Sequence, residues 1–401
     1  METGLPLPIE PLAYHVQMVQ YLKSQESDLW TWFSGDRLQK QQNDAVRLDL
    51  LKSTYRIERE ANAALYAAAD TVSSKLGLAV PTTFYQAQGV SGTNACLAYT
   101  PGEVHIVLIG PVLAALTETE LRCVLGHELL HFVLLDRWRD YMISSQLLAA
   151  MSNDESAQPA HIASARLFQL YTEVYCDRGA HLVSGDLNAT ITALVKTETG
   201  ATDASAESYL RQVDEVFAKG HPRAEGVTHP ETFIRARAIK LWAEQPQIAA
   251  QEITGVIEGP LAIEELDLLG QQRVSELTRR LANVALQPKW IQTEPTLAHA
   301  RLFFSDFQPK AAPDKEMAQD LKCASEKLRD YACYVLLDFA TADRDLEEAP
   351  LAAMLLLSDD LGVGERFRQL AAKELNLRKK QLAALETDAT KIVAEAARGE
   401  D

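Results

Sequence analysis

The sequence predicts an α+β fold that is predominantly helical, with one small mixed sheet and an all-α C-terminal domain. Apolar residues recur at helical spacing over most of the chain, which is typical of amphipathic helices. Residues 78–111 differ, because "LAVPTTFYQAQGVSGTNACLAYTPGEVHIVLIGP" is rich in β-branched and aromatic residues and is interrupted by Pro and Gly. Beyond residue 315 the pattern is helical again and ends in a charged tail.

Length, composition and charge restrict the class of protein. The chain has 401 residues, 47% of them hydrophobic, and a net charge of −17. So acidic a surface argues against nucleic acid and anionic membrane as main partners. No stretch approaches the roughly 18 uninterrupted apolar residues that a membrane-spanning helix needs. We therefore expect no nucleic-acid partner and no membrane span.

Cysteine usage and the N-terminal sequence predict a cytoplasmic location. The number of cysteines is odd and no pair has C-x-x-C spacing, which indicates reduced thiols in a cytosol-like compartment. The five are Cys96, Cys123, Cys176, Cys323 and Cys333. The N-terminal "METGLPLPIEPLAYHV" has neither the basic nor the apolar region of a signal peptide.

Four segments are expected in order. They are an N-terminal helical segment (1–50), a candidate catalytic domain (51–245), a helical connector and linker (246–314), and a helical C-terminal domain (315–401). Residues up to about 77 carry helical spacing, and Gly77 is a plausible helix stop. Two or three short strands follow, with turns at Gly89–Gly92 and Pro101–Gly102. Helices resume at Thr117, and Gln308–Glu316, "QPKAAPDKE", has the composition of a linker.

The stretch "TETELRCVLGHELLHFV" contains an HExxH motif on a well-specified helix. Thr117 and Glu120 have the spacing of a capping box at its start. His127 and His131 are one helical turn apart and can share a cation, while Glu128 can reach a metal-bound water. The alternative is an apolar helix with two hydrogen-bonded core histidines. The motif favours a zinc site.

A catalytic zinc ion needs a third protein ligand. In "LFQLYTEVYCDRGAHLVSG", Glu173 and Asp177 share one helical face. Glu173 could complete a His₂Glu ligand set, and Asp177 could hydrogen-bond the free nitrogen of a ligand histidine. A solvated acidic face is the alternative, but the surrounding helix is largely apolar.

Four motifs in order resemble the M48 family of zinc metallopeptidases. They are "TNACLAYTPGEVHIVLIGPVLAAL", "VLGHELLHF", "EVYCDRGA" and "THPETFIRARAI", and the resemblance covers about residues 50–245. It implies a zincin-like fold and one Zn²⁺ per chain, bound by His127, His131 and Glu173. It also implies that Glu128 is the general base.

The resemblance implies further roles. Asn94, Ala95 and the strand Val104–Ile109, with Val107 at its middle, would hold the substrate backbone in extended form as an added strand. His229 and Arg235 would lie near the carbonyl oxygen that becomes negative in the transition state. For His229 the alternative is a helix-entry residue before a proline.

The chain also departs from the family. Many members carry transmembrane helices, and none is expected here. Cys123 and Cys176 lie close in sequence to proposed site residues and could contact the metal, but we interpret both as core residues. His221 is also followed by proline and has no matching role.

The C-terminal part resembles the TerB-like helical domain over about residues 315–385. The resemblance depends mostly on the turn "ADRDLEE", with Asp343, Asp345 and Glu348. Oxygen ligands there could hold a divalent cation, but an acidic helix start explains the same residues. We expect this domain to bind a protein partner or to regulate the enzyme.

Together these features predict a soluble, zinc-dependent endopeptidase of gluzincin type that acts on a peptide or protein substrate. Two alternatives remain open. One is a catalytically idle peptide-binding or scaffold protein that keeps the fold. The other is a regulated component of a stress response whose C-terminal domain recruits a partner.

Overall fold

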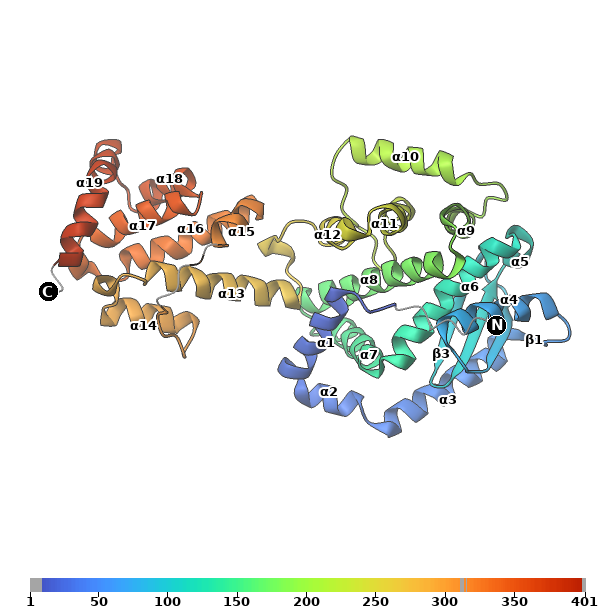
Figure 1. Cartoon of the computed structure of the whole chain (residues 1–401). Helices are drawn as coiled ribbons and strands as arrows, with labels where there is room; N and C mark the ends of the chain where they lie inside the picture. Colours follow the sequence, from blue (N-terminus) through green and yellow to red (C-terminus); the bar gives the residue numbers. More distant parts are fainter. Residues whose placement is uncertain (1–8, 311–313, 315, 399–401) are drawn as a thin grey trace. The chain divides into compact units, whose positions relative to one another are not determined.

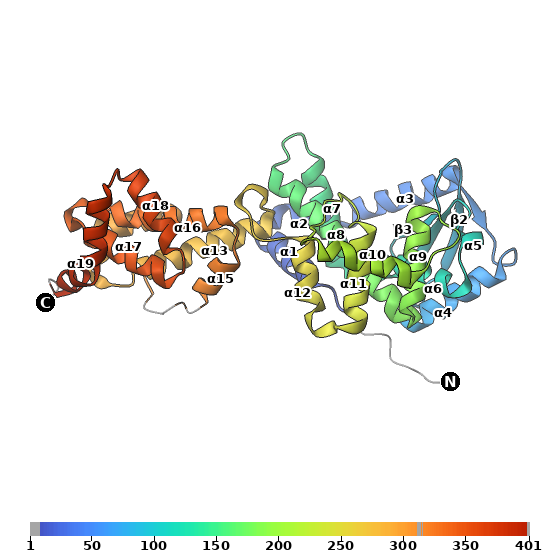
Figure 2. The ribbon, with the colours of Figure 1, turned by 90° about the horizontal axis from the view of Figure 1, so that it is seen from above.

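The computed structural model describes residues 9–310, 314 and 316–398, except for the side chains of residues 36–42. The chain forms two compact units, Met1–Gly259 and Pro260–Asp401, which are described separately (Figures 1 and 2). The described residues are mostly helical and contain one mixed sheet, as the sequence predicted. None of the helices among them is long and apolar enough to cross a membrane.

The first unit combines helices with the sheet. Its helices are α1 (Ala13–Gln25), α2 (Ser27–Phe33), α3 (Asp36–Ser53), α4 (Ala63–Leu76), α5 (Val112–Ala115), α6 (Glu118–Phe132), α7 (Arg139–Asn153), α8 (Pro159–Ser184), α9 (Leu187–Thr199), α10 (Ala206–Ala218), α11 (Thr232–Glu244) and α12 (Pro246–Ile257). A π-helical turn, η1 (Val133–Arg137), follows α6 directly. The strands are β1 (Thr54–Ile57), β2 (Thr82–Ala87), β3 (Asn94–Thr100) and β4 (Glu103–Ile109).

The sheet has the strand order β1-β2-β4-β3. β1 pairs antiparallel with β2, β2 pairs parallel with β4, and β3 pairs antiparallel with β4. The predicted turns are confirmed: Gly89, Gly92 and Gly102 all have positive φ, a conformation that glycine adopts without a Cβ penalty. Gly77 ends α4 in the left-handed conformation, as predicted.

Two predictions about the strands are wrong. Residues 54–57 form β1 in a segment expected to be helical, because Thr54, Tyr55 and Ile57 suit a strand and the segment pairs with β2. The strand predicted at Val104–Ile109 was expected to pair with the substrate backbone, which requires a free edge, but β4 is interior. Val107 pairs with β2 on one side and with β3 on the other, so its backbone has no free edge for a substrate. The edge strand on that side is β3.

Helices cover both faces of the sheet. α3 crosses one face from β1 to β3, whereas α4 and α6 lie on the other (Figures 1 and 2). α6 packs closely against α8, since a Cβ on Gly179 of α8 would lie 2.4 Å from Leu130 Cγ of α6. This close approach brings the functional side chains of the two helices within contact distance.

Helices α9, α10 and α11 form a small apolar cluster beside α6 and α8. Its buried members are Ile191, Leu194, Val195, Ala206, Val213, Ala236 and Ile239. The cluster holds α9 and α11 in place, and both helices contribute residues to the candidate site.

The second unit is all-helical in its described part. It contains η2 (Ile263–Glu265), α13 (Leu268–Ala285), η3 (Lys289–Ile291), α14 (Glu294–Phe303), α15 (Met317–Cys323), α16 (Glu326–Thr341), η4 (Arg344–Leu346), α17 (Ala349–Asp360), α18 (Gly364–Glu374) and α19 (Lys379–Arg398). Its acidic turn is as predicted: α16 ends just before it, and Asp343 Oδ1 accepts a hydrogen bond from the Asp345 backbone N–H at 2.9 Å.

The expected linker Gln308–Glu316 lies inside this second unit, apart from residues 311–313 and 315, which are outside the described residues. Leu281 and Ala300 before it share one hydrophobic core with Leu336 and Leu355 after it. The units therefore meet at residues 259 and 260, earlier in the chain than the expected domain start at 315.

Candidate metal centre

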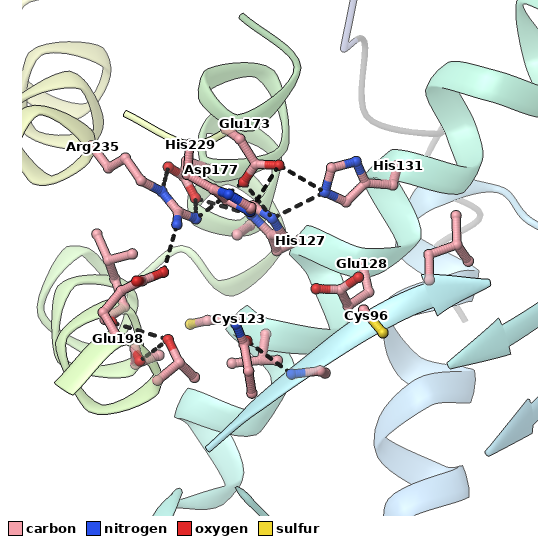
Figure 3. A pocket seen from close by; sticks show the side chains of 18 of the residues that line it. Cys96, Cys123, His127, Glu128, His131, Glu173, Asp177, Glu198, His229 and Arg235 are labelled. Atoms are coloured by element: carbon pink, nitrogen blue, oxygen red, sulfur yellow. Dashed lines mark hydrogen bonds and ion pairs between the residues drawn. The ribbon is translucent and has the colours of Figure 1, made fainter. Parts of the chain in front are cut away.

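Helix α6 carries the HELLH sequence and begins at the predicted capping box. Thr117 Oγ1 accepts from the Glu120 N–H at 3.3 Å, and Glu120 Oε2 accepts from the Thr117 N–H at 2.7 Å. The box sets where the helix starts and therefore which side chains share a face. His127 and His131 share one face, and their Nε2 atoms are 3.2 Å apart (Figure 3).

Helix α8 brings Glu173 to the same point. Glu173 Oε2 lies 3.3 Å from His127 Nε2, and Glu173 Oε1 lies 3.5 Å from His131 Nε2. Only 6% of the Glu173 side chain is exposed, and its buried Oε2 makes no hydrogen bond of good geometry. A buried carboxylate is costly without positive charge beside it, and Arg235 Nη2 lies 3.6 Å from this oxygen, too far for a hydrogen bond of good geometry.

These three side chains fit a metal ion. In the tautomer whose Nδ1–H donates to Asp177, the Nε2 of His127 is an acceptor. Three hydrogen-bond acceptors then face one another: His127 Nε2, His131 Nε2 and the Glu173 carboxylate. A cation placed among them would stabilise this arrangement. Two imidazoles and one carboxylate are a donor set suited to Zn²⁺.

Cys176 also approaches this group from α8. Its Sγ lies within 4.8 Å of ligand nitrogens of His127 and His131. The thiol is fully buried, and burial raises its pKa well above the ordinary value. Because the thiolate is the form that binds metals, the neutral thiol of Cys176 is a weaker metal ligand than the Glu173 carboxylate.

Behind the histidines, α8 and α11 supply a buried ion pair. His127 Nδ1 is 3.0 Å from Asp177 Oδ1. Arg235 of α11 donates to both Asp177 oxygens, through Nε and Nη2, at 2.8 Å each. Both side chains of this pair are 6% exposed. The bidentate contact fixes the Asp177 carboxylate, which in turn orients the His127 ring.

Burial and charge shift the pKa values of the ligand set in different directions. Burial acts to lower the pKa of His127, but hydrogen bonds with Asp177 and Glu173 raise it to about 10. Burial acts to raise the pKa of Glu173, but the two histidines and Arg235 lower it to about 2. Burial lowers the pKa of His131 to about 4. The metal-free site therefore keeps the Glu173 and Asp177 carboxylates ionised and His127 protonated, and a metal ion that binds here would take the place of the proton on His127 Nε2.

Glu128 is on the side of α6 that faces β3. It is 5% exposed. Burial raises the pKa of its carboxyl to about 7, although the positive charge of His127 and a hydrogen bond from the Leu97 backbone oppose this shift. A carboxyl that titrates near neutrality can both accept and donate a proton, as a general base requires.

The other predicted site residues are placed as follows. His229 has a side chain that is 53% exposed, with Nε2 3.5 Å from Glu173 Oε1. Asn94 and Ala95 begin β3, where Asn94 Oδ1 accepts from the Ala95 N–H at 2.8 Å. Val107 lies on the interior strand β4, and Arg235 lies behind Asp177.

Glu198 near the end of α9 was not anticipated from the sequence. Its Oε1 accepts a hydrogen bond from Arg235 Nη1 at 2.9 Å (Figure 3). One acidic residue near a helix end has no diagnostic spacing, so no sequence signal marked it. This contact uses Nη1, the guanidinium nitrogen of Arg235 that does not bond to Asp177.

Apart from Cys176 and Val107, these residues border one cavity of about 230 Å³ (Figure 3). β3 forms one wall and α9 the opposite wall, while α6 lies between them. A cleft with two histidines, a buried carboxyl and a free strand edge has the features of a metallopeptidase active site.

Comparison with known proteins agrees with this class. Residues 59–243 match the model of peptidase family M48, so the first unit contains a peptidase family M48 domain, and this match supports a metallopeptidase-type function. The match does not extend to the second unit. No curated protein and no solved structure is significantly similar to the chain.

Proposed function

We propose that the protein is a zinc-dependent endopeptidase. The observation that carries the proposal is the convergence of His127, His131 and Glu173 beside the buried carboxyl of Glu128. The M48 match over this part of the chain supports a peptide or protein substrate.

His127, His131 and Glu173 would hold one zinc ion. When bound, zinc supplies Lewis acidity toward the scissile carbonyl and lowers the pKa of a bound water. Asp177 keeps the His127 ring in the orientation and tautomer that metal binding requires. Arg235 holds Asp177, and its guanidinium is engaged by Asp177 and Glu198, so we assign it to positioning rather than to the carbonyl oxygen.

Glu128 is the proposed general base. Its carboxylate would take a proton from the attacking water and give it to the nitrogen of the leaving amine. A pKa of about 7 suits both transfers near neutral pH. His229, which is partly exposed at the rim of the cleft, is the proposed donor to the carbonyl oxygen.

The substrate backbone would pair with the free edge of β3. One side of β3 is bonded to β4, and its other side faces Glu128, which accepts a hydrogen bond from the Leu97 backbone. Backbone groups alternate along a strand, so those of Ala95 and Tyr99 face the same free edge as Leu97. Pairing there would lay a peptide bond next to Glu128 and the histidines.

The test compares Glu128→Gln with His131→Ala in metal content and casein hydrolysis. The parent should bind about one zinc per chain, as three-ligand catalytic sites do. Glu128→Gln should keep that metal and lose activity by on the order of 10²–10⁴-fold. His131→Ala should lose both. The assignment would be refuted if His131→Ala bound as much zinc as the parent, or if Glu128→Gln hydrolysed casein at the parent rate. A parent protein that binds zinc but hydrolyses nothing would favour an idle peptide-binding protein.

A further inference from the structure

A chain of polar contacts runs from the wall of the cleft to a candidate zinc ligand. It begins at Glu198 of α9, whose Oε1 accepts a hydrogen bond from Arg235 Nη1 at 2.9 Å. Arg235 of α11 donates to Asp177 of α8, and Asp177 Oδ1 lies 3.0 Å from His127 Nδ1 of α6 (Figure 3). Four helices are therefore connected through side chains that end at the metal centre.

The Arg235 guanidinium is the rigid part of this chain. Nε and Nη2 each lie 2.8 Å from an Asp177 oxygen, while Nη1 bonds to Glu198. Because a guanidinium is planar and presents its donors in a fixed fork, the contact at Nη1 limits rotation of the whole group. His127 Nδ1 and Arg235 Nη2 contact the same oxygen, Asp177 Oδ1. A rotation of the guanidinium would therefore move the oxygen that orients the His127 ring.

Burial leaves the Arg235 guanidinium dependent on its carboxylate partners. Its side chain is 6% exposed, whereas that of Glu198 is 33% exposed. Burial acts to lower the pKa of Arg235, but the charges of Asp177, Glu173 and Glu198 raise it above its ordinary value, so the group stays charged. Asp177 and Glu173 contact Nε and Nη2, and among the contacts described only Glu198 engages Nη1.

Glu198 occupies an unfavourable position in its own helix. It lies in the last turn of α9, where the helix dipole disfavours a carboxylate. The helix is also held in place without it: Leu194 belongs to the apolar cluster of α9, α10 and α11, and Lys196 makes a buried ion pair with Glu120 at 2.9 Å. Its contact with Arg235 therefore explains Glu198 better than a role in fastening α9 does.

We propose that Glu198 is a positioning residue of the metal centre, which acts on the zinc ligand His127 through Arg235. The inference rests on the proposed zinc site. Charge acts in the same direction as geometry. A divalent ion, the carboxylates of Glu173 and Asp177 and one guanidinium together leave one net positive charge, which Glu198 offsets. Glu198 should therefore strengthen zinc binding without touching the ion.

The test is the zinc dissociation constant of the full chain, measured by competition with a chelator of known affinity. Glu198→Ala should weaken zinc binding by about tenfold. That is the lower end of the effect of residues that hydrogen-bond to metal ligands, because Glu198 is two contacts further from the ion. Glu198→Gln keeps an acceptor for Arg235 Nη1 but loses the charge, so its affinity should lie between those of the parent and Glu198→Ala.

Glu207→Ala is the matched control. Glu207 of α10 also pairs with an arginine, Arg211, at 2.6 Å, but the two side chains are 82% and 65% exposed and do not border the cavity. This variant should bind zinc as the parent does. Melting temperatures of the metal-free variants verify that each is folded. The ¹⁵N chemical shift of His127 Nδ1 in the zinc-loaded protein should change in Glu198→Ala and stay the same in Glu207→Ala.

A second background shows whether the effect passes through the chain of contacts. In Asp177→Asn the link between Arg235 and His127 is already weakened. Adding Glu198→Ala to this variant should therefore change zinc affinity much less than it does in the parent, because residues that act through one another are not additive.

The outcomes separate this inference from the proposed function. If the parent binds no zinc, both fail. If the parent binds zinc but cuts no peptide, the endopeptidase function fails, and the zinc affinities still test the positioning role. Parent-like zinc affinity in Glu198→Ala would overturn that role. The same loss in the parent and in the Asp177→Asn background would overturn it as well, since Glu198 would then act independently of Asp177.

Discussion

Helix α8 contacts two histidines on two different faces, and their pKa values shift in opposite directions. His15 of α1 is 0% exposed, and burial lowers its pKa to about 3. Its ring packs edge-on against Phe168, with centroids 4.9 Å apart, and its Nε2 lies 3.2 Å from Thr172 Oγ1. Only 13% of the His127 side chain is exposed, but Asp177 and Glu173 overcome the effect of burial and raise its pKa to about 10.

The difference shows that burial alone does not make a histidine functional. Around His15 the neighbours are aromatic rings and one hydroxyl, so the neutral imidazole is a core side chain. Around His127 two carboxylates from the same helix hold positive charge, whether a proton or a metal ion. The partner residues, and not the histidine, decide which role the site can take.

Removing the Asp177 carboxylate, which contacts both His127 and Arg235, should have the largest effect on the free energy of unfolding. Asp177→Ala leaves the buried guanidinium of Arg235 without its main partner, which should lower the free energy of unfolding by about 3–5 kcal/mol. Urea unfolding of the metal-free protein measures this without a contribution from zinc binding.

Asp214→Ala is the control for that variant. Asp214 pairs with Lys240 at 3.0 Å, but its side chain is 50% exposed, so the loss should stay below about 1 kcal/mol. Equal losses in the two variants would contradict the distinction between a buried network and a surface pair.

His229 tests whether a third histidine near Glu173 takes part in catalysis. His229→Ala should lower kcat more than it raises KM, by roughly 2–4 kcal/mol in transition-state stabilisation, if its ring donates to the carbonyl oxygen. His221→Ala is the matched control, because His221 is also exposed and followed by proline. Parent-like rates for His229→Ala would show that this residue is structural.

His15 should make stability depend on pH. The folded protein keeps this imidazole neutral down to pH about 3, whereas the unfolded chain takes up a proton near the ordinary value of 6.5. Between these values the unfolded state binds more protons, so stability falls as the pH drops, by about 1.4 kcal/mol per unit. His15→Phe should remove this dependence, about 2 kcal/mol between pH 6.5 and 5.

The measurement is the free energy of unfolding of the metal-free parent and His15→Phe at both pH values. Other groups titrate equally in the two proteins, so the difference between them isolates His15. The same pH dependence in both would mean that His15 is protonated in the folded state.

Substitution of Asp343 in the acidic turn of the second unit should have the smallest effect on stability. Asp343 has no histidine or arginine partner among the contacts described; it bonds to the backbone of its own turn. Asp343→Ala should therefore cost about 1 kcal/mol, as the loss of a capping residue does. Asp343→Asn should keep most of that stability. A clear increase in the parent's melting temperature with Ca²⁺, absent in Asp343→Ala, would show instead that the turn binds a cation.

Much of the candidate site could be predicted because its signals are local. The i, i+4 spacing of His127 and His131 puts them on one helical face, and the same holds for Glu173 and Asp177. The contact between these two pairs was expected, but the spacing within each helix does not by itself produce it. It depends on the close packing of α6 on α8 at Gly179 and on Arg235, which comes from a third helix.

The sheet likewise could be predicted only in its local features. The composition of residues 78–111 predicted two or three strands with their turns, and the structure has three there, since β-branched residues and glycines act over a few positions. It did not predict that residues 54–57 would join the sheet as β1. It also did not predict that β4 would be interior, which moves the substrate's pairing edge to β3. Strand order is set by pairing between distant segments, and no single segment encodes it.

The sequence by itself determined the HELLH helix, its capping box and the identity of the candidate ligands, because each depends on residues within a turn or two of each other. Only the tertiary structure decided that Glu198 reaches Arg235 and that α9 faces β3 across the cleft. It also decided that α13 and α14 share the core of the second unit. These features depend on apolar faces that become buried together only when distant segments pack, so no local spacing records them.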